Sequence, residues 1–143
     1  MNKVYTIGYE GKDIEDLIDI LNKYDIKQII DVRSHPKSRK KVFSQEPLKD
    51  KLFEKSVKYE HLPGLGGLDE KDYHRVMEKK EWKKAFEELK SLIEKRKSAM
   101  MCLEKNPMKC HRRFISEKLE GEGWEVIHIG EGGSWKGKRL DEF

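Results

Sequence analysis

The regular alternation of strand-like and helix-like segments constrains the fold of this chain most strongly. Five segments rich in apolar and β-forming residues are predicted as strands, over residues 3–8, 27–32, 57–62, 99–103 and 125–129. The segments between them carry apolar residues at helical spacing, and the first follows Asp13, which can cap a helix. This order predicts a single α/β domain over residues 1–129. It would hold a mostly parallel five-stranded sheet with helices on both faces, a Rossmann-like or flavodoxin-like three-layer sandwich, followed by a glycine-rich tail over residues 130–143.

Composition limits the classes of protein to which the chain can belong. Its 143 residues suffice for one domain with a real core. Charged residues make up 41% of the chain, which is a pattern enriched in hyperthermophiles and also found on any highly charged surface. The net charge of +4 does not require a nucleic-acid partner. No apolar stretch approaches the ~20 residues of a membrane span, and the chain starts directly with a strand-like segment. We therefore expect a cytoplasmic protein without a membrane partner; cofactor and oligomeric state remain unknown.

The carboxyl-terminal edge of the predicted sheet is the expected site of binding, because ligands of open parallel sheets bind beyond the strand ends. Arg33 follows the second strand, two residues after Asp31, so both side chains point to the same side and Asp31 can orient Arg33. A hydroxyl, two guanidinium groups and two glycines add anion-binding features on this edge. The predicted anion-binding residues are Arg33, Ser38, Arg39, Gly66, Gly67 and Arg112.

The run Cys110-His111-Arg112 follows the fourth predicted strand and a polar loop, near the start of a helix. A helix N-terminus lowers the pKa of a thiol and attracts anions, and a neighbouring imidazole can transfer protons. Adjacent helical residues diverge by about 100°, so the three side chains cannot all face one ligand. The structural alternative is a packed thiol beside a surface ion pair. The predicted catalytic residues are Cys110, His111, Glu104 just past the fourth strand, and His61 at the end of the third.

The two cysteines of the chain are Cys102 and Cys110. In the cytoplasm we expect free thiols rather than a disulfide, a preference that weakens for a hyperthermophile, and we expect Cys102 to be a buried, inert thiol. The two thiols, together with nearby histidines, could supply metal ligands, but the spacing C-x7-C-H matches no standard zinc pattern. No metal ligand is therefore predicted.

Several short motifs, in this order along the chain, resemble the domain of unknown function 488 family, uncharacterised α/β proteins with a C-terminal Cys-His-Arg motif. The matching pieces include Tyr5-Thr6-Ile7-Gly8, Asp31-Val32-Arg33, Cys102-x-Glu104, Cys110-His111-Arg112 and Val126 to Ile129. The resemblance implies a compact α/β domain whose motif residues gather on one edge. It implies no reaction and no substrate.

The functional prediction is an enzyme-like pocket at the strand ends for a phosphate-bearing or other small anionic ligand, such as a nucleotide. The first alternative is a nucleic-acid-binding module, whose basic loop from Lys37 to Lys41 would contact the phosphate backbone. The second alternative is a metal-binding or thiol redox protein. Whether the protein is an enzyme is left open.

Overall fold

The computed structural model describes residues 2–67, 72–104, 106, 110–130 and 133–136, without the side chains of residues 133, 135 and 136. The strands are β1 (Lys3–Gly8), β2 (Gln28–Asp31), β3 (Lys58–His61), β4 (Ser98–Cys102), β5 (Glu125–Gly130) and β6 (Gly133–Lys136). The α-helices are α1 (Ile14–Lys23), α2 (Gln45–Glu54), α3 (Tyr73–Met77), α4 (Lys80–Lys95) and α5 (Arg112–Gly121), and the 3-10 turns are η1 (Lys41–Phe43) and η2 (Pro63–Leu65).

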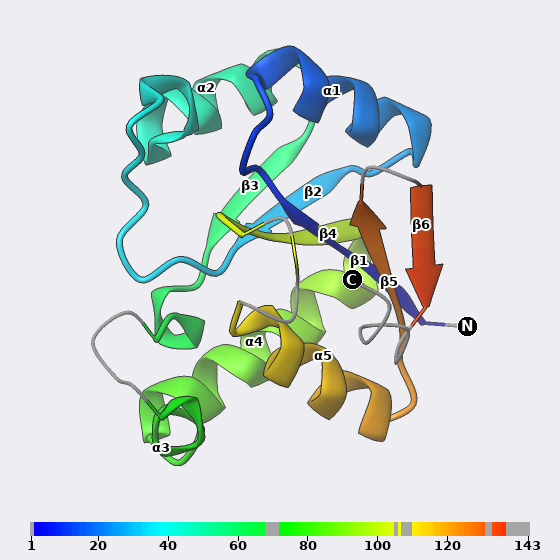
Figure 1. Ribbon diagram of the computed structural model, residues 1–143. Coiled ribbons are helices and arrows are strands. Elements are labelled where there is room, and N and C mark those ends of the chain that lie inside the picture. Colours follow the sequence, from blue (N-terminus) through cyan, green and yellow to red (C-terminus); the bar gives the residue numbers. More distant parts are fainter. Residues whose placement is uncertain (1, 68–71, 105, 107–109, 131–132, 137–143) are drawn as a thin grey trace.

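One sheet, with strand order β3-β2-β4-β1-β5-β6, forms the middle layer. The first five strands are parallel to one another and β6 runs antiparallel to β5. Helices α1 and α2 lie against one face, and α3, α4 and α5 lie against the other (Figure 1). Each face packs its own hydrophobic core. The predicted α/β architecture with helices on both faces is confirmed.

The helix boundaries follow local capping chemistry. The Asp13 carboxylate accepts a hydrogen bond from the Asp16 amide, and the Asp16 carboxylate accepts one from the Asp13 amide, so α1 begins with a full capping box. Helix α2 begins at Gln45, two residues before Pro47. Pro47 falls in the first turn, where the missing N–H costs nothing because it has no partner inside the helix.

The glycine-rich tail contributes β6, which the sequence analysis did not predict. This strand pairs with β5 from Gly130 opposite Gly133 to Ile127 opposite Lys136. Glycine is depleted in strands, and a strand of four residues has little periodicity, so the pattern carried no signal. Residues 137–143 of the tail lie outside the described part.

The ends of β1, β2 and β4 meet at one edge of the sheet and create a crevice there. The Tyr9 amide donates to the Cys102 carbonyl, and the Val32 amide donates to the Met101 carbonyl, at 3.1 and 3.2 Å. Central strand β4 continues into α5 on one face, whereas its neighbours β1 and β2 continue toward α1 and α2 on the opposite face (Figure 1). Chains that leave neighbouring strands in opposite directions open a crevice between them, which is where open α/β sheets bind ligands.

None of the helices in the described part of the chain combines the length and the apolar character needed to cross a bilayer.

Candidate functional site

A cavity of about 440 Å³ occupies this crevice, and we call it the strand-end pocket. Its walls come from the ends of β1, β2 and β4, from Gly67 in the loop after η2, and from the two residues before α5. The polar and sulfur-bearing residues that line it are Tyr9, Arg33, Ser34, His35, Lys37, Cys102, Glu104, Cys110 and His111. Segments far apart in the sequence thus place a cation, a carboxylate, an imidazole and both sulfurs around one volume.

Arg33 and Asp31 form a buried ion pair at the end of β2. The Arg33 Nε donates to Asp31 Oδ1 at 2.9 Å and Nη2 donates to Oδ2 at 2.7 Å, a bidentate arrangement. Asp31 is fully buried and Arg33 is 6% exposed. Burial opposes the charge of Arg33, but the hydrogen bonds and charge of Asp31 outweigh it and raise the pKa of Arg33. The prediction that Asp31 orients Arg33 is confirmed by these contacts.

Two tyrosines complete the surroundings of this pair. The Tyr59 hydroxyl donates to Asp31 Oδ2 at 2.5 Å, and the Arg33 Nη1 donates to the Tyr9 hydroxyl at 3.2 Å. The guanidinium carbon of Arg33 also lies 5.3 Å from the centre of the Tyr9 ring. Burial, followed by the charge of Asp31, raises the pKa of Tyr59, so its hydroxyl stays protonated as a donor. Sequence analysis missed both tyrosines, because only the fold brings them to β2.

Two histidines hold the backbone that follows β2. His61 Nε2 lies 2.7 Å from the Arg33 carbonyl oxygen, and His111 Nε2 lies 2.9 Å from the Val32 carbonyl oxygen. A carbonyl oxygen can only accept, so each imidazole carries its proton on Nε2. His61 Nδ1 faces the Gln45 side-chain amide at 3.4 Å. His61 therefore contacts protein groups through both nitrogens, and it supports Arg33 rather than lining the strand-end pocket.

His111 presents its other nitrogen to sulfur. His111 Nδ1 lies 4.0 Å from Cys110 Sγ, and its Nε2 proton fixes Nδ1 as the lone-pair nitrogen. Burial lowers the pKa of His111, and the hydrogen bond to Val32 only partly offsets this effect. The ring also stacks on Tyr73, with centroids 5.3 Å apart. A neutral, fixed imidazole thus faces Cys110.

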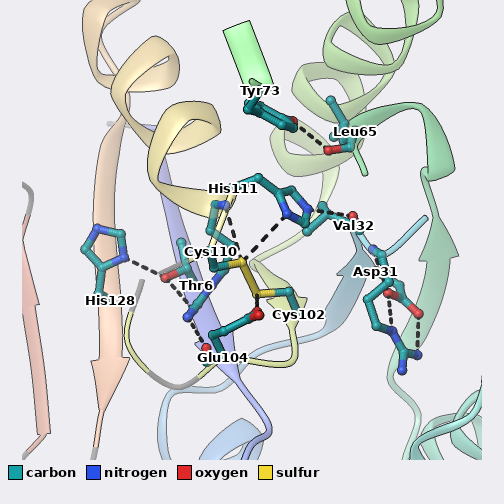
Figure 2. Close-up of a disulfide and its surroundings, with 12 residues drawn as sticks. Thr6, Asp31, Val32, Leu65, Tyr73, Cys102, Glu104, Cys110, His111 and His128 are labelled. Atoms are coloured by element: carbon teal, nitrogen blue, oxygen red, sulfur yellow. Dashed lines mark hydrogen bonds and ion pairs between the residues drawn. A yellow bond between two sulfur atoms is a disulfide. The ribbon is translucent and has the colours of Figure 1, made fainter. Parts of the chain in front are cut away.

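Cys102 and Cys110 are joined by a disulfide, so the expectation of two free thiols is wrong. Figure 2 shows the bond with Glu104 on one side and His111 on the other. Glu104 Oε2 lies 3.8 Å from Cys102 Sγ. Cys110 lies two residues before α5, and Cys102 is the last residue of β4. The end of the strand and the residues before the helix bring the two sulfurs together, a contact that the spacing alone did not reveal.

Arg112 lies beneath the strand-end pocket rather than in it. Its side chain is fully buried. Nη1 donates to Thr6 Oγ1 at 3.1 Å and Nη2 donates to the Glu104 carbonyl at 2.5 Å. Among the described residues, Nε has no hydrogen-bond partner and no carboxylate lies within ion-pair distance. Burial lowers the pKa of Arg112 to about 10, against the opposing charge of Glu104. Cys110 and His111 line the pocket without Arg112, as the divergence of adjacent side chains predicts.

Thr6 links Arg112 to a buried histidine. Thr6 Oγ1 lies 2.6 Å from His128 Nδ1, and both residues are almost fully buried (Figure 2). Burial, and then the positive charge of Arg112, lowers the pKa of His128 to about 4. His128 therefore stays neutral near pH 7. Its place within an apolar strand pattern gave no sign of this role.

Of the remaining predicted site residues, Gly67 lines the strand-end pocket, and Ser38, Arg39 and Gly66 lie beside it. Ser38 and Arg39 line a neighbouring hollow of about 550 Å³, and the Ser38 hydroxyl accepts from the Lys40 amide. Gly67 lines the strand-end pocket, and both glycines line a further hollow of about 830 Å³. A Cβ on Gly66 would lie 2.6 Å from the Ser34 Cα, and one on Gly67 would lie 2.6 Å from the Tyr73 ring. These glycines allow close packing of protein segments.

Comparison with protein families gives one finding. The model of the family described as Domain of unknown function DUF488 matches residues 13–119, most of the chain. The chain belongs to this family. The match includes Asp31 to Arg33 and the segment from Cys102 to Arg112, and it leaves out β1 and β5, which the motif resemblance also used. The family description assigns no reaction and no ligand. Neither a curated protein nor a solved structure matches the DUF488 chain significantly.

Proposed function

We propose that the strand-end pocket binds a small anionic ligand carrying a phosphate or carboxylate group, and that Arg33 holds it. The observation that carries this proposal is the number of Arg33 guanidinium donors that other protein groups use. A guanidinium has five N–H donors, and Asp31 and Tyr9 accept from three of those of Arg33. Among the described residues the other two donors have no hydrogen-bond acceptor, and they belong to a rigid, buried cation at the wall of a cavity. A preorganised donor fork is the geometry that planar anions bind best.

The charges around the pocket support the same proposal. Lys37 lines the pocket on an exposed loop, opposite the segment that carries Glu104. Asp31 balances the charge of Arg33. The net charge around the pocket therefore depends on Lys37, on Glu104 and on the buried Arg112. Two positive charges against one negative charge leave the pocket attractive to an anion. Cys110, His111 and Glu104 would lie beside the bound ligand, where any chemistry on it would take place.

Lys37→Glu tests the proposal without disturbing the core, because Lys37 is exposed. Inorganic phosphate at about 100 times its dissociation constant should raise the free energy of unfolding of the natural chain by about 2.7 kcal/mol. Reversing a charge a few ångströms from the anion should weaken phosphate binding by about tenfold. The measurement is the phosphate-dependent shift of the melting temperature, each variant being compared with its own ligand-free value.

Lys95→Glu is the matched control, since it makes the same charge change at an exposed position. Lys95 is the last residue of α4, and this end of the helix leads to the opposite edge of the sheet. Its phosphate response should equal that of the natural chain. An equal loss in both variants, or no phosphate response in the natural chain, would contradict the proposal.

The nucleic-acid alternative predicts a different outcome in the same series. Arg39 and Lys40 are exposed and line the neighbouring hollow, outside the strand-end pocket. If that loop grips duplex DNA, replacing Arg39, Lys40 and Lys41 by alanine should change the slope of log affinity against log salt by about 2.7, since each phosphate contact contributes roughly −0.9. Tight, salt-dependent DNA binding that disappears in this triple variant would favour the alternative over a small ligand.

A further inference from the structure

We propose that reduction of the Cys102–Cys110 disulfide converts the strand-end pocket into a binding site for one thiophilic divalent metal ion, such as Zn²⁺. The ligands would be the two cysteine sulfurs, the Glu104 carboxylate and His111 Nδ1. This site does not depend on the anion proposal, because none of its ligands is Arg33 or Lys37, the residues proposed to hold the anion.

The positions of the ligand atoms carry the first step. One sulfur each from Cys102 and Cys110 and a carboxylate oxygen of Glu104 all lie within 4.8 Å of one another. Figure 2 shows the Glu104 carboxylate directed at the sulfurs. Once reduction lets the two sulfurs separate, an ion about 2.0–2.3 Å from each ligand atom fits within a cluster of this size. Thiolate, carboxylate and imidazole are the donor types that Zn²⁺ takes in proteins.

His111 is arranged as a fourth ligand. Nδ1 is the lone-pair nitrogen and lies 4.0 Å from Cys110 Sγ, while Nε2 donates to the Val32 carbonyl. Histidines that bind metals almost always donate the other ring N–H to a carbonyl or carboxylate, which fixes the orientation of the ring. The orientation of the ring therefore exists before any ion binds, but Nδ1 lies outside the 4.8 Å cluster of the other three ligand atoms and joins them only when the sulfurs separate.

The second step is the charge balance at the sulfurs. Two thiolates and one carboxylate carry three negative charges, so a divalent ion leaves a net charge of −1. Arg112 supplies a buried positive charge directly beneath: its Nη2 binds the Glu104 carbonyl and its backbone amide donates to Cys110 Sγ at 3.5 Å. A buried cation without a carboxylate partner among the described residues is thus matched by the metal-bound state.

The disulfide and the metal exclude each other, because a sulfur in the disulfide has no thiolate to offer. A phosphine reductant transfers two electrons to the sulfur–sulfur bond and becomes a phosphine oxide. Water supplies the oxygen, and its two protons reach the two sulfurs. The metal then displaces both thiol protons into solvent.

The experiment compares the full chain in its oxidised and phosphine-reduced forms by equilibrium dialysis against Zn²⁺, without phosphate and after removal of the reductant. The reduced form should bind one ion per chain, and the oxidised form should bind at least about 100-fold more weakly. Co²⁺ in place of Zn²⁺ should give thiolate charge-transfer absorption in the reduced form alone. No metal binding by reduced, folded protein, or equal binding by both forms, would overturn the proposal.

Variants test each ligand separately. Replacing both cysteines by serine should abolish binding, and Glu104→Gln or His111→Gln should each weaken it by about 10- to 100-fold. His74→Gln and Glu94→Gln, which change exposed residues outside the pocket, should leave it unchanged. Unchanged metal affinity in the serine variant would overturn the assignment. So would metal binding that needs the cysteines but is unchanged in Glu104→Gln and His111→Gln. Lys37→Glu should keep metal binding, which separates this result from the fate of the anion proposal.

Discussion

Arg33 and Arg112 are both buried guanidinium groups at the same edge of the sheet, yet their surroundings differ. Arg33 is bidentate to the fully buried carboxylate of Asp31. Arg112 binds only a hydroxyl and a carbonyl, and its Nε has no partner in the described part of the chain. The sequence analysis placed both in one class of anion-binding residues, and the structure separates them.

The difference shows two uses of a buried positive charge. The charge of Arg33 is neutralised inside the protein, so its remaining donors can direct an incoming anion without a large desolvation cost. Among the described residues no carboxylate forms an ion pair with Arg112. Its charge lowers the pKa of His128, and the residue contacts both the Glu104 carbonyl and Cys110. Under the two proposals, Arg33 would contact the ligand and Arg112 would support the sulfur site electrostatically.

The largest expected effect comes from replacing each arginine by methionine in the disulfide form. Arg33→Met leaves the Asp31 carboxylate buried without its partner and should lower the free energy of unfolding by about 3–5 kcal/mol. Arg112→Met loses two hydrogen bonds to neutral acceptors but also removes a buried charge, so it should cost only about 1–3 kcal/mol. Denaturant unfolding measures both.

The exposed Arg113→Met variant serves as the control and should stay within about 0.5 kcal/mol, because its ion pair with Glu117 is solvent-exposed. Adding Asp31→Asn to Arg33→Met should recover part of the loss. A cost for Arg112→Met that exceeds that of Arg33→Met would contradict the comparison.

The strand ends of the fold were predictable from sequence, and so was one part of the site. Alternation of apolar residues located β1 to β5, and the two-residue spacing of Asp31 and Arg33 predicted their ion pair. Local spacing holds this information because both residues lie on one extended segment. The same reasoning located the capping residue of α1.

The contacts that define the rest of the site join segments far apart in the sequence. Tyr59 reaches Asp31 from β3, and Thr6 reaches Arg112 from β1. Nothing in a run of charged residues distinguishes a fully buried arginine from a surface one, since burial depends on which carbonyls and hydroxyls the fold brings near. The disulfide likewise depends on the path of a polar loop, for which periodicity gives no prediction.

A smaller effect, on pH dependence, sharpens the role of Arg112. His128 has a pKa of about 4 when folded against an ordinary value of 6.5, so the unfolded chain binds a proton that the folded chain does not. Stability should be complete above about pH 6.5 and fall as pH decreases toward 4. From pH 7 to pH 5 the contribution of His128 to the free energy of unfolding should fall by about 2 kcal/mol.

This loss should shrink in Arg112→Met, because removing the positive charge raises the pKa of His128. It should disappear in His128→Gln, leaving only the pH dependence of other groups, among them His111, whose pKa is also lowered by burial. Denaturant unfolding at the two pH values checks all three chains. Identical pH dependence in the natural chain and in His128→Gln would refute the assignment.

The central claim, that the strand-end pocket binds an anion through Arg33, is tested most directly by nuclear magnetic resonance of the arginine side chains. The uniformly ¹⁵N-labelled chain is titrated with inorganic phosphate while the side-chain N–H signals of each arginine are followed. The account predicts saturable shifts at Arg33, accompanied by backbone shifts near Lys37, and little change in the side-chain signals of Arg112 and Arg39. Saturable shifts at Arg112 or Arg39 with Arg33 unmoved, or no saturable shift at any arginine, would contradict it.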